Sequence, residues 1–239
     1  MGQPGRGLTP AGRRASVLAA RLENGPWMSI TLETLSGEAL RPIMADLARL
    51  RITVFREWPY LYEGDAEYEK KYLEFYVKSP GAAVVIARDG AQVIGASSCL
   101  PLRDEAPDVR APFEARGLSP DQFFYFGESV LLPSYRGQGL GVRFFEERER
   151  YALTDSRAEF AVFCSVRRPA EHPLRPEGAG TLHAFWAKRG FSPLPGVACT
   201  MMWKEPGQVD ETLHWLDFFI KPLRAAPVPQ VLLQPEKQS

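Results

Sequence analysis

The sequence has few cysteines and histidines, which limits the metal and redox chemistry that it can support. Only three residues of each type occur among 239. Cys99, Cys164 and Cys199 lie far apart in apolar runs and show no CxxC spacing, so we expect buried free thiols and neither a disulfide nor a zinc site. The histidines form no HxxxH-type pair. The sequence therefore predicts no bound metal.

An excess of charge and a long apolar run are also missing. Lysine plus arginine equals aspartate plus glutamate at 29 each, so nothing indicates long-range attraction to nucleic acid or to an anionic membrane. No apolar stretch approaches the ~20 residues that span a bilayer, and the first residues do not resemble a secretory signal. We expect a cytoplasmic protein without nucleic-acid or membrane partners, either a monomer or a homodimer.

The chain has enough apolar residues, 45% of the total, to form a real core. Residues 1–27 are rich in Gly, Arg, Pro and Ala, and residues 226–239 are rich in proline. We expect a disordered N-terminal extension, one domain over 28–225 and a flexible tail. Met28 directly precedes the first predicted strand, which leaves both Met1 and Met28 as candidate starts of translation.

Hydrophobic periodicity predicts the element order β-α-α-β-β-β-α-β-α-β-β. Residues 101–120 form a polar, proline-containing excursion, and Asp89-Gly90 suits the tight turn of a hairpin. The result is an α/β protein (an α+β mixed sheet) with helices over both faces. The strands are expected at 29–35, 82–88, 92–100, 123–132, 160–166, 197–204 and 213–221, and the helices at 36–58, 66–77, 140–158 and 182–189.

The segment from Glu128 to Gly141 is where the sequence indicates chemistry. A strand leads into a glycine-rich turn at which a helix begins, and clustered amides at a helix N-terminus favour a phosphate or pyrophosphate. Gly139 and Gly141 would let oxygens approach the backbone, and Arg136 could orient the loop or contact phosphate. Neither GxxxxGK[ST] nor GxGxxG spacing is present. A glycine turn that only caps the helix is the alternative.

The same segment resembles a signature of the GNAT superfamily of acyl-CoA-dependent N-acyltransferases. Arg136-x-x-Gly139-x-Gly141 is similar to that family's (Arg/Gln)-x-x-Gly-x-(Gly/Ala), and residues 131–135 resemble its Val-x-Pro-x-Tyr lead-in. Residues 185–191 resemble its second signature, Phe-Tyr-x-Lys-x-Gly-Phe.

The resemblance covers residues 29–221 and implies the GNAT fold, a central sheet splayed between its fourth and fifth strands. Segments 55–65 and 168–176 are similar to those of a bacterial subgroup of GNAT acetyltransferases whose acceptor we cannot name.

The resemblance also implies acetyl-CoA as the co-substrate. Backbone groups of Val130, Leu131 and Leu132 would pair with the pantetheine arm. Trp186 would stack on the adenine or simply pack in the core. The pyrophosphate would be held by the loop and the helix start, at Arg136, Gly137, Gln138, Gly139, Leu140 and Gly141.

Acylation of an amine needs a proton acceptor, and Glu128 is the candidate general base because it is the only carboxylate in the central strand. A structural role beside Arg167, Arg168 or Ser129 is the alternative. Trp186 stands where many GNAT members have a tyrosine that protonates the thiolate. The substitutes are Tyr135, Tyr125, Cys164 or His183, unless the thiolate leaves unassisted.

Two loops are candidates for binding the acceptor. Trp58, Tyr60 and Tyr62, with acidic neighbours, could cradle a cationic amine, although an aromatic loop packed on the core is equally consistent. Arg168 and His172 lie in a second loop that suits a carboxylate or phosphate. The leading hypothesis is direct acetyl transfer to a small metabolite's amine. A catalytically weak acyl-CoA-binding sensor or interaction module is the alternative.

Overall fold

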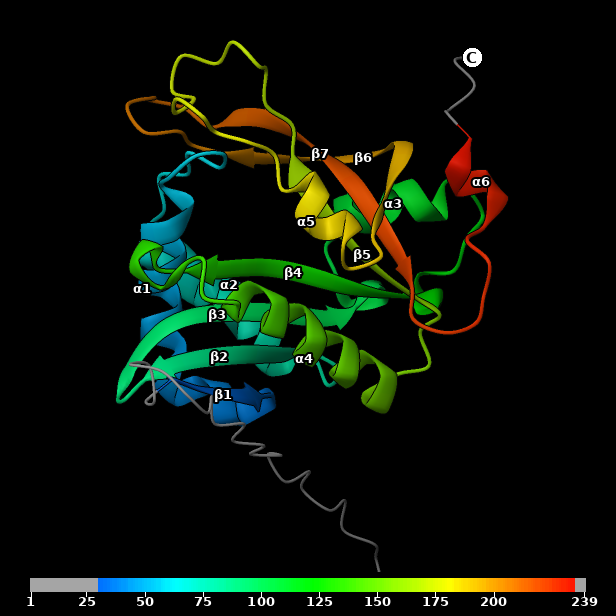
Figure 1. Ribbon diagram of the computed structural model, residues 1–239, viewed down its shortest axis with the longest axis horizontal. Coiled ribbons are helices and arrows are strands. Elements are labelled where there is room, and N and C mark those ends of the chain that lie inside the picture. Colours follow the sequence, from blue (N-terminus) through cyan, green and yellow to red (C-terminus); the bar gives the residue numbers. More distant parts are fainter. Residues whose placement is uncertain (1–29, 235–239) are drawn as a thin grey trace, which may run out of the picture.

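The computed structural model describes residues 30–234, and its centre is a seven-stranded sheet. The strand order is β1-β2-β3-β4-β5-β7-β6 (Figure 1). Every neighbouring pair is antiparallel except β4 and β5, which are parallel. The predicted mixed sheet is therefore confirmed. The strands are β1 (Ile30–Leu35), β2 (Ala83–Asp89), β3 (Gln92–Pro101), β4 (Phe123–Leu131), β5 (Phe160–Val166), β6 (Ser192–Trp203) and β7 (Thr212–Pro222).

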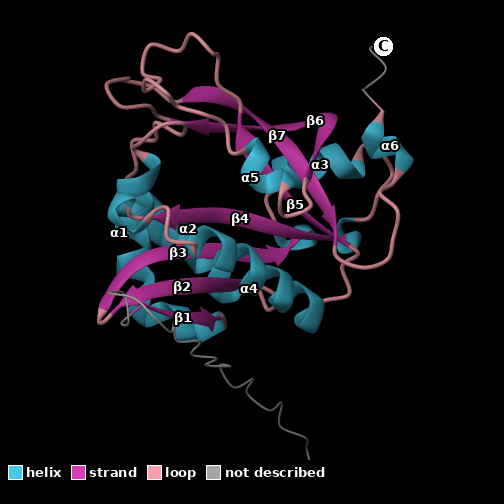
Figure 2. Ribbon diagram, in the orientation of Figure 1, coloured by secondary structure: helices cyan, strands magenta, loops and turns pink. Residues whose placement is uncertain are grey.

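Helices cover both faces of the sheet, as expected (Figure 2). Buried residues of α1, α2, α3 and α6 belong to one core cluster. On the opposite face lie the buried residues of α4 together with the partly buried Phe185 and Trp186 of α5. Figure 1 shows α4 and α5 in front of the sheet and α1 and α2 behind it. The helices are α1 (Met44–Phe55), α2 (Ala66–Lys78), α3 (Pro107–Glu114), α4 (Leu140–Asp155), α5 (His183–Ala187) and α6 (Gln230–Leu233).

Two helix starts illustrate how side chains fix local structure. Asp65 caps α2, because its carboxylate accepts hydrogen bonds from the amides of Glu67 and Tyr68 at 2.6 and 3.2 Å. The single helix expected from Ser36 is instead split into a 3₁₀ segment, Gly37–Ile43, and α1. Pro42 accounts for the break, since it lacks the N–H that a continuous helix would use there.

Two further expectations meet different structure, and a third falls outside the described residues. Residues 101–120 contain α3, whose Val109 and Phe113 are buried one turn apart. The tail expected to be flexible is ordered as far as residue 234, and Leu232 of α6 is fully buried against the core. The expected extension over 1–27 and residues 235–239 lie outside the described residues.

The sheet opens between β4 and β5, where the GNAT resemblance places the splay. The two strands pair only through residues 123–125 and 160–162. Beyond Tyr125, no strand within residues 30–234 pairs with β4 on its β5 side, although β3 still pairs with it as far as Leu131. The backbone groups along that edge are therefore available to a ligand.

Candidate active site

The loop before α4 presents a row of backbone amides without internal acceptors. Gly137 and Gly139 have φ angles of 77° and 83°, in the left-handed region that favours glycine. The amides of Val142 and Arg143 donate to the carbonyl of Gly139. Among the described residues, no acceptor is found for the amides from Gly137 to Gly141. Consecutive unpaired amides at the positive end of a 16-residue helix make an anion site.

The second signature lies against this loop. A Cβ placed on Gly141 would be 3.4 Å from the Phe185 ring, so α5 packs on the first turn of α4. The Trp186 indole packs edge-on against Phe163 and Phe219, with ring centroids 5.0 and 4.8 Å apart. This aromatic packing supports the core role for Trp186.

A β-bulge turns the side chain of Glu128 toward α1 and α2. Two residues of β4, Gly127 and Glu128, stand opposite the single residue Ser98 of β3. Without the bulge, strict alternation would place Glu128 on the α4 face beside Phe126. Position 127 requires glycine, because a Cβ there would lie 2.4 Å from the Ser98 hydroxyl and 2.9 Å from that of Tyr76.

Glu128 ends in a buried network of charge and hydroxyl groups. Arg51 of α1 pairs with Glu128 at 2.7 Å and also with Glu69 of α2. The hydroxyls of Tyr72 and Tyr76 donate to Glu128 at 3.1 and 3.4 Å. One guanidinium thus pairs with two carboxylates, those of Glu128 and Glu69, whose side chains are 11% and 0% exposed.

The partners that the sequence suggested for Glu128 are engaged elsewhere. Arg167 pairs with Asp217, and Arg168 pairs with Glu205. The Ser129 hydroxyl is hydrogen-bonded to that of Ser97. Arg51 was not foreseen as the partner, because it lies 77 positions earlier and only the packing of α1 on β4 brings it close.

Two carboxylates on this face have pKa values shifted in opposite directions. Burial alone would raise the pKa of Glu128, but the charge and hydrogen bond of Arg51 outweigh it and hold the pKa below the usual 4.5. Burial raises the pKa of Glu105 to about 7, partly offset by a hydrogen bond from the Ala106 amide, and the charge of Glu128 raises it further. Glu105 follows β3 in the segment interpreted as a polar excursion, and no sequence signal singles it out.

The candidate proton donors fall on different faces of the sheet. Tyr135 donates its hydroxyl to Asp89 at 2.9 Å and packs with α4, away from the face that Glu128 shares with α1 and α2. Tyr125 and Cys164 lie on the Glu128 face, with hydroxyl and thiol 3.0 Å apart. The structure therefore brings Tyr125, and not Tyr135, to the Glu128 side.

The two predicted acceptor loops do meet, but several of their residues serve to hold them together. Arg168 donates to the carbonyls of Pro59 and Tyr60 while it pairs with Glu205, and its side chain is only 8% exposed. It is thus a clamp between the loops. The rings of Trp58 and His172 are in contact, with centroids 5.2 Å apart.

Tyr60 and Tyr62 of the first loop pack inward. The Tyr60 ring lies 4.6 Å from that of Phe55 and 6.1 Å from that of Trp203. Tyr62 also packs against the core cluster under α1 and α2. The aromatic loop therefore anchors itself through these tyrosines, whereas Trp58 contacts the ring of His172 in the second loop.

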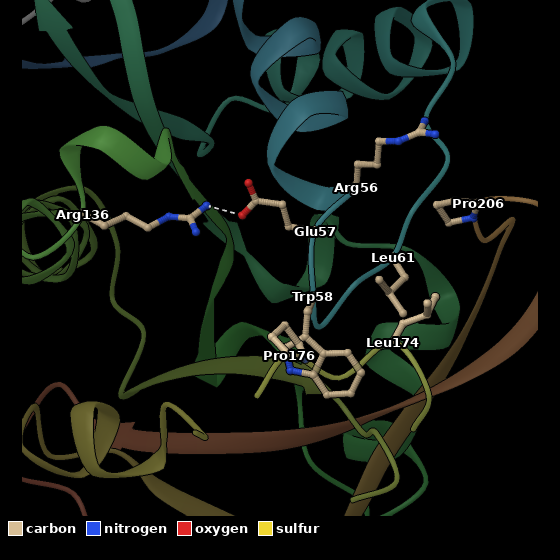
Figure 3. Close-up of a pocket in the computed structure, with 8 residues that line it drawn as sticks. All are labelled: Arg56, Glu57, Trp58, Leu61, Arg136, Leu174, Pro176 and Pro206. Atoms are coloured by element: carbon tan, nitrogen blue, oxygen red, sulfur yellow. Dashed lines mark ion pairs between the residues drawn. The ribbon is translucent and has the colours of Figure 1, made fainter. Parts of the chain in front are cut away.

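A cavity of about 540 Å³ opens between the two loops and the amide loop. Figure 3 shows Arg136 reaching across it to Glu57, with the Nη2–Oε2 distance at 2.8 Å. The rest of the wall is mostly apolar. The lining residues are Arg56, Glu57, Trp58, Leu61, Arg136, Leu174, Pro176 and Pro206.

Neither a metal site nor a membrane-spanning helix is found within residues 30–234. No group of three or more His, Cys, Asp or Glu side chains in that range is placed to hold a metal ion. The helices described there are all too short or too polar to cross a membrane.

Comparisons with known proteins agree with this architecture. The model of the acetyltransferase (GNAT) family matches residues 47–191. An acetyltransferase from Streptococcus agalactiae 2603 has 17% identity and a TM-score of 0.51, over 80% of this chain and 98% of that one. An N-acetyltransferase from Staphylococcus aureus Mu50 has 13% identity and a TM-score of 0.51, over 82% and 99%.

The Salmonella typhimurium protein yncA, solved with its cofactor acetyl-CoA, has 13% identity and a TM-score of 0.50, over 84% of this chain and 98% of that one. At such identities the likeness concerns the fold. No curated protein matches the sequence.

Proposed function

Since this chain belongs to the acetyltransferase (GNAT) family, we propose that it transfers the acetyl group of acetyl-CoA directly to the amine of a small molecule. The observation that carries the proposal is the row of unpaired amides from Gly137 to Gly141 at the start of α4. A Cβ added at Gly137 or Gly139 would meet open space, so oxygens can reach the backbone there. These features fit the pyrophosphate of a coenzyme A.

The edge of β4 would hold the rest of acetyl-CoA, which supplies an activated thioester when bound. Val130, Leu131 and Leu132 remain the proposed partners of the pantetheine arm. The Leu131 carbonyl already accepts from Arg136, and the Leu132 amide donates to Ile94. The remaining polar groups on the unpaired side of β4 are therefore the ones available for orienting the thioester.

We place the proton transfer on the face of the sheet covered by α1 and α2. Glu128 is the first candidate acceptor, because it lies where β4 leaves β5 and takes hydrogen bonds from Tyr72 and Tyr76. Its lowered pKa weakens it as a base. Glu105 is the second candidate, since a pKa of about 7 suits proton transfer at neutral pH. For protonation of the leaving thiolate, Tyr125 replaces Tyr135 as our candidate, because Tyr125 shares the Glu128 face.

The cavity beside Trp58 is the proposed entrance for the acceptor. Its apolar wall suits the hydrocarbon part of a small amine. Tyr60, Tyr62, Arg168 and His172 would shape this entrance by holding the two loops together.

Two observations favour the alternative, an acyl-CoA-binding module with little catalysis. Glu128 is committed to an ion pair with Arg51, and Trp186 cannot protonate a thiolate. Release of thiol from acetyl-CoA across a panel of small amines separates the two functions, because a module that only binds acyl-CoA gives no amine-dependent release.

The cofactor site is tested by thermal unfolding with Gly141→Asp and a matched control. Acetyl-CoA binds only the folded protein, so it should raise the Tm of the wild type. Gly141→Asp adds a negative charge at the first turn of α4, next to the unpaired amides, and should abolish that rise. Gly180→Asp adds the same charge in an open loop and should leave it intact. A rise that survives in Gly141→Asp would show that acetyl-CoA binds elsewhere.

A further inference from the structure

An ion pair joins the two halves of the proposed active site. Arg136 belongs to the loop that offers its amides to pyrophosphate, and Glu57 belongs to the loop after α1 that borders the acceptor cavity. Their side chains are 2.8 Å apart and 46% and 42% exposed. Arg136 also donates through Nε to the Leu131 carbonyl at 3.1 Å. The Nη2 group of Arg136 is thus the one that forms the ion pair with Glu57 (Figure 3).

We infer that Glu57 couples the two substrates, by competing with pyrophosphate for Arg136 and then by recognising a cationic acceptor. This inference rests on the proposed function, in which the pyrophosphate lies at residues 137–141. A pyrophosphate there carries more negative charge than one carboxylate, and amides hold it next to Arg136. The exposed pair with Glu57 is weak enough to yield, since such pairs contribute only ~0–1 kcal/mol.

Release of Arg136 changes the charge of the acceptor cavity. Among the described residues, Glu57 is the only carboxylate in the cavity wall, which Trp58 also lines. Arg56 is the other cation of the wall, and its carboxylate contact is with Glu63, at 3.9 Å. Once Arg136 turns to pyrophosphate, the Glu57 carboxylate faces a cavity whose remaining wall, apart from Arg56, is apolar. Such a cavity takes an amine that has a cationic group and a hydrocarbon body.

The coupling predicts that one substitution acts in opposite directions on the two substrates. Glu57→Gln keeps the shape of the side chain but removes the charge that competes for Arg136. Coenzyme A should then bind more tightly and the amine more weakly. General damage to the loop would weaken both.

Glu63→Gln is the matched control. Glu63 lies in the same loop and pairs with Lys204 at 3.3 Å, as well as with Arg56. It has no contact with Arg136 among the ion pairs of the described residues. Its neutralisation removes the same charge without freeing Arg136, so it should change neither affinity.

The first measurement is calorimetric binding of coenzyme A at low ionic strength. Glu57→Gln should bind coenzyme A and 3′-dephospho-coenzyme A about two- to fivefold more tightly than the wild type. Pantetheine, which lacks the pyrophosphate, should bind both proteins equally. An unchanged affinity for coenzyme A in Glu57→Gln, or an equal gain for pantetheine, would overturn the competition.

The second measurement is the KM of an amine that the wild type acetylates, with phenylethylamine as the first probe, at saturating acetyl-CoA. Glu57→Gln should raise this KM by about tenfold, the effect of losing one charged hydrogen bond, while Glu63→Gln should not. An unchanged KM would remove Glu57 from acceptor recognition. If the wild type fails to bind coenzyme A at all, the proposed function itself is wrong. If the wild type binds coenzyme A but Glu57→Gln and Glu63→Gln behave alike, only the coupling through Glu57 is wrong.

Discussion

Arg51 on α1 and Arg148 on α4 are both buried beside β4, on opposite faces of the sheet, and their surroundings differ in kind. Arg51 pairs with Glu69 and Glu128. Arg148 is 1% exposed and lies 4.6 Å from the ring centroids of Phe126 and Phe145. Its hydrogen bonds go to backbone carbonyls, and no carboxylate of residues 30–234 lies within ion-pair distance.

The two arginines also differ in how their surroundings shift their pKa values. Burial lowers the pKa of Arg148 to about 10. Burial acts in the same direction on Arg51, but the charges of Glu128 and Glu69 outweigh it and raise the pKa well above the usual value. On the α4 face, aromatic rings therefore surround the buried Arg148, which has no carboxylate partner among residues 30–234. The face toward α1 and α2 holds the buried ion pairs of Arg51 with Glu69 and Glu128.

The largest expected effect comes from breaking the charge pairing. Arg51→Met should lower the free energy of unfolding by about 3–5 kcal/mol, because it leaves two carboxylates buried without a cation. Arg148→Met should cost less than about 1.5 kcal/mol, since it removes a desolvated charge that has no carboxylate partner and largely keeps the volume. Urea unfolding of both variants at neutral pH measures the difference. Equal losses would mean that the two faces do not differ as described.

A smaller effect should follow from removing the bulge that orients Glu128. Gly127→Ala places a methyl group against the hydroxyls of Ser98 and Tyr76, and it should cost about 1–3 kcal/mol by overpacking. The shift of β4 should also reduce amine acetylation. At Gly180 the added methyl group meets open space. Gly180→Ala is therefore the control for the effect of replacing a glycine where no overpacking results. A fully stable and active Gly127→Ala would show that the bulge does not determine the position of Glu128.

The smallest effect concerns the pH dependence of stability. Glu105 has a raised pKa, so the folded state holds its proton where the unfolded state does not, and stability is lost as pH rises from about 4.5 to about 7. Glu128 has a lowered pKa and stabilises above 4.5, with the contribution lost as pH falls through its folded value. Glu105→Gln should therefore gain Tm relative to the wild type at pH 8 but not at pH 5. The same difference at both pH values would contradict the raised pKa.

The fold was predictable where local chemistry determines it. Alternating apolar residues located the strands, Asp89-Gly90 marked the hairpin, and the glycines at 139 and 141 marked the start of α4. The site was less predictable, because it depends on contacts between distant segments. The bulge at Gly127 turns Glu128 toward Arg51. Glu105 comes near Glu128 only through the pairing of β3 with β4, which local sequence does not reveal. Arg168 was expected to face the acceptor, yet loop carbonyls use its donors.

The most direct test of amine acylation on the α1–α2 face is the pH dependence of amine-stimulated thiol release from acetyl-CoA. We expect Glu128→Gln to lower the rate by about 10²-fold, with acetyl-CoA affinity little changed, and to lose the acidic limb that the wild type shows below the usual carboxyl range. Its melting curve must be recorded beside the rate, because a loss of stability in step with activity would indicate a structural partner of Arg51 alone. A limb near pH 7 that disappears in Glu105→Gln would assign the proton to Glu105 instead. A stable Glu128→Gln with full activity would contradict the role of Glu128 outright.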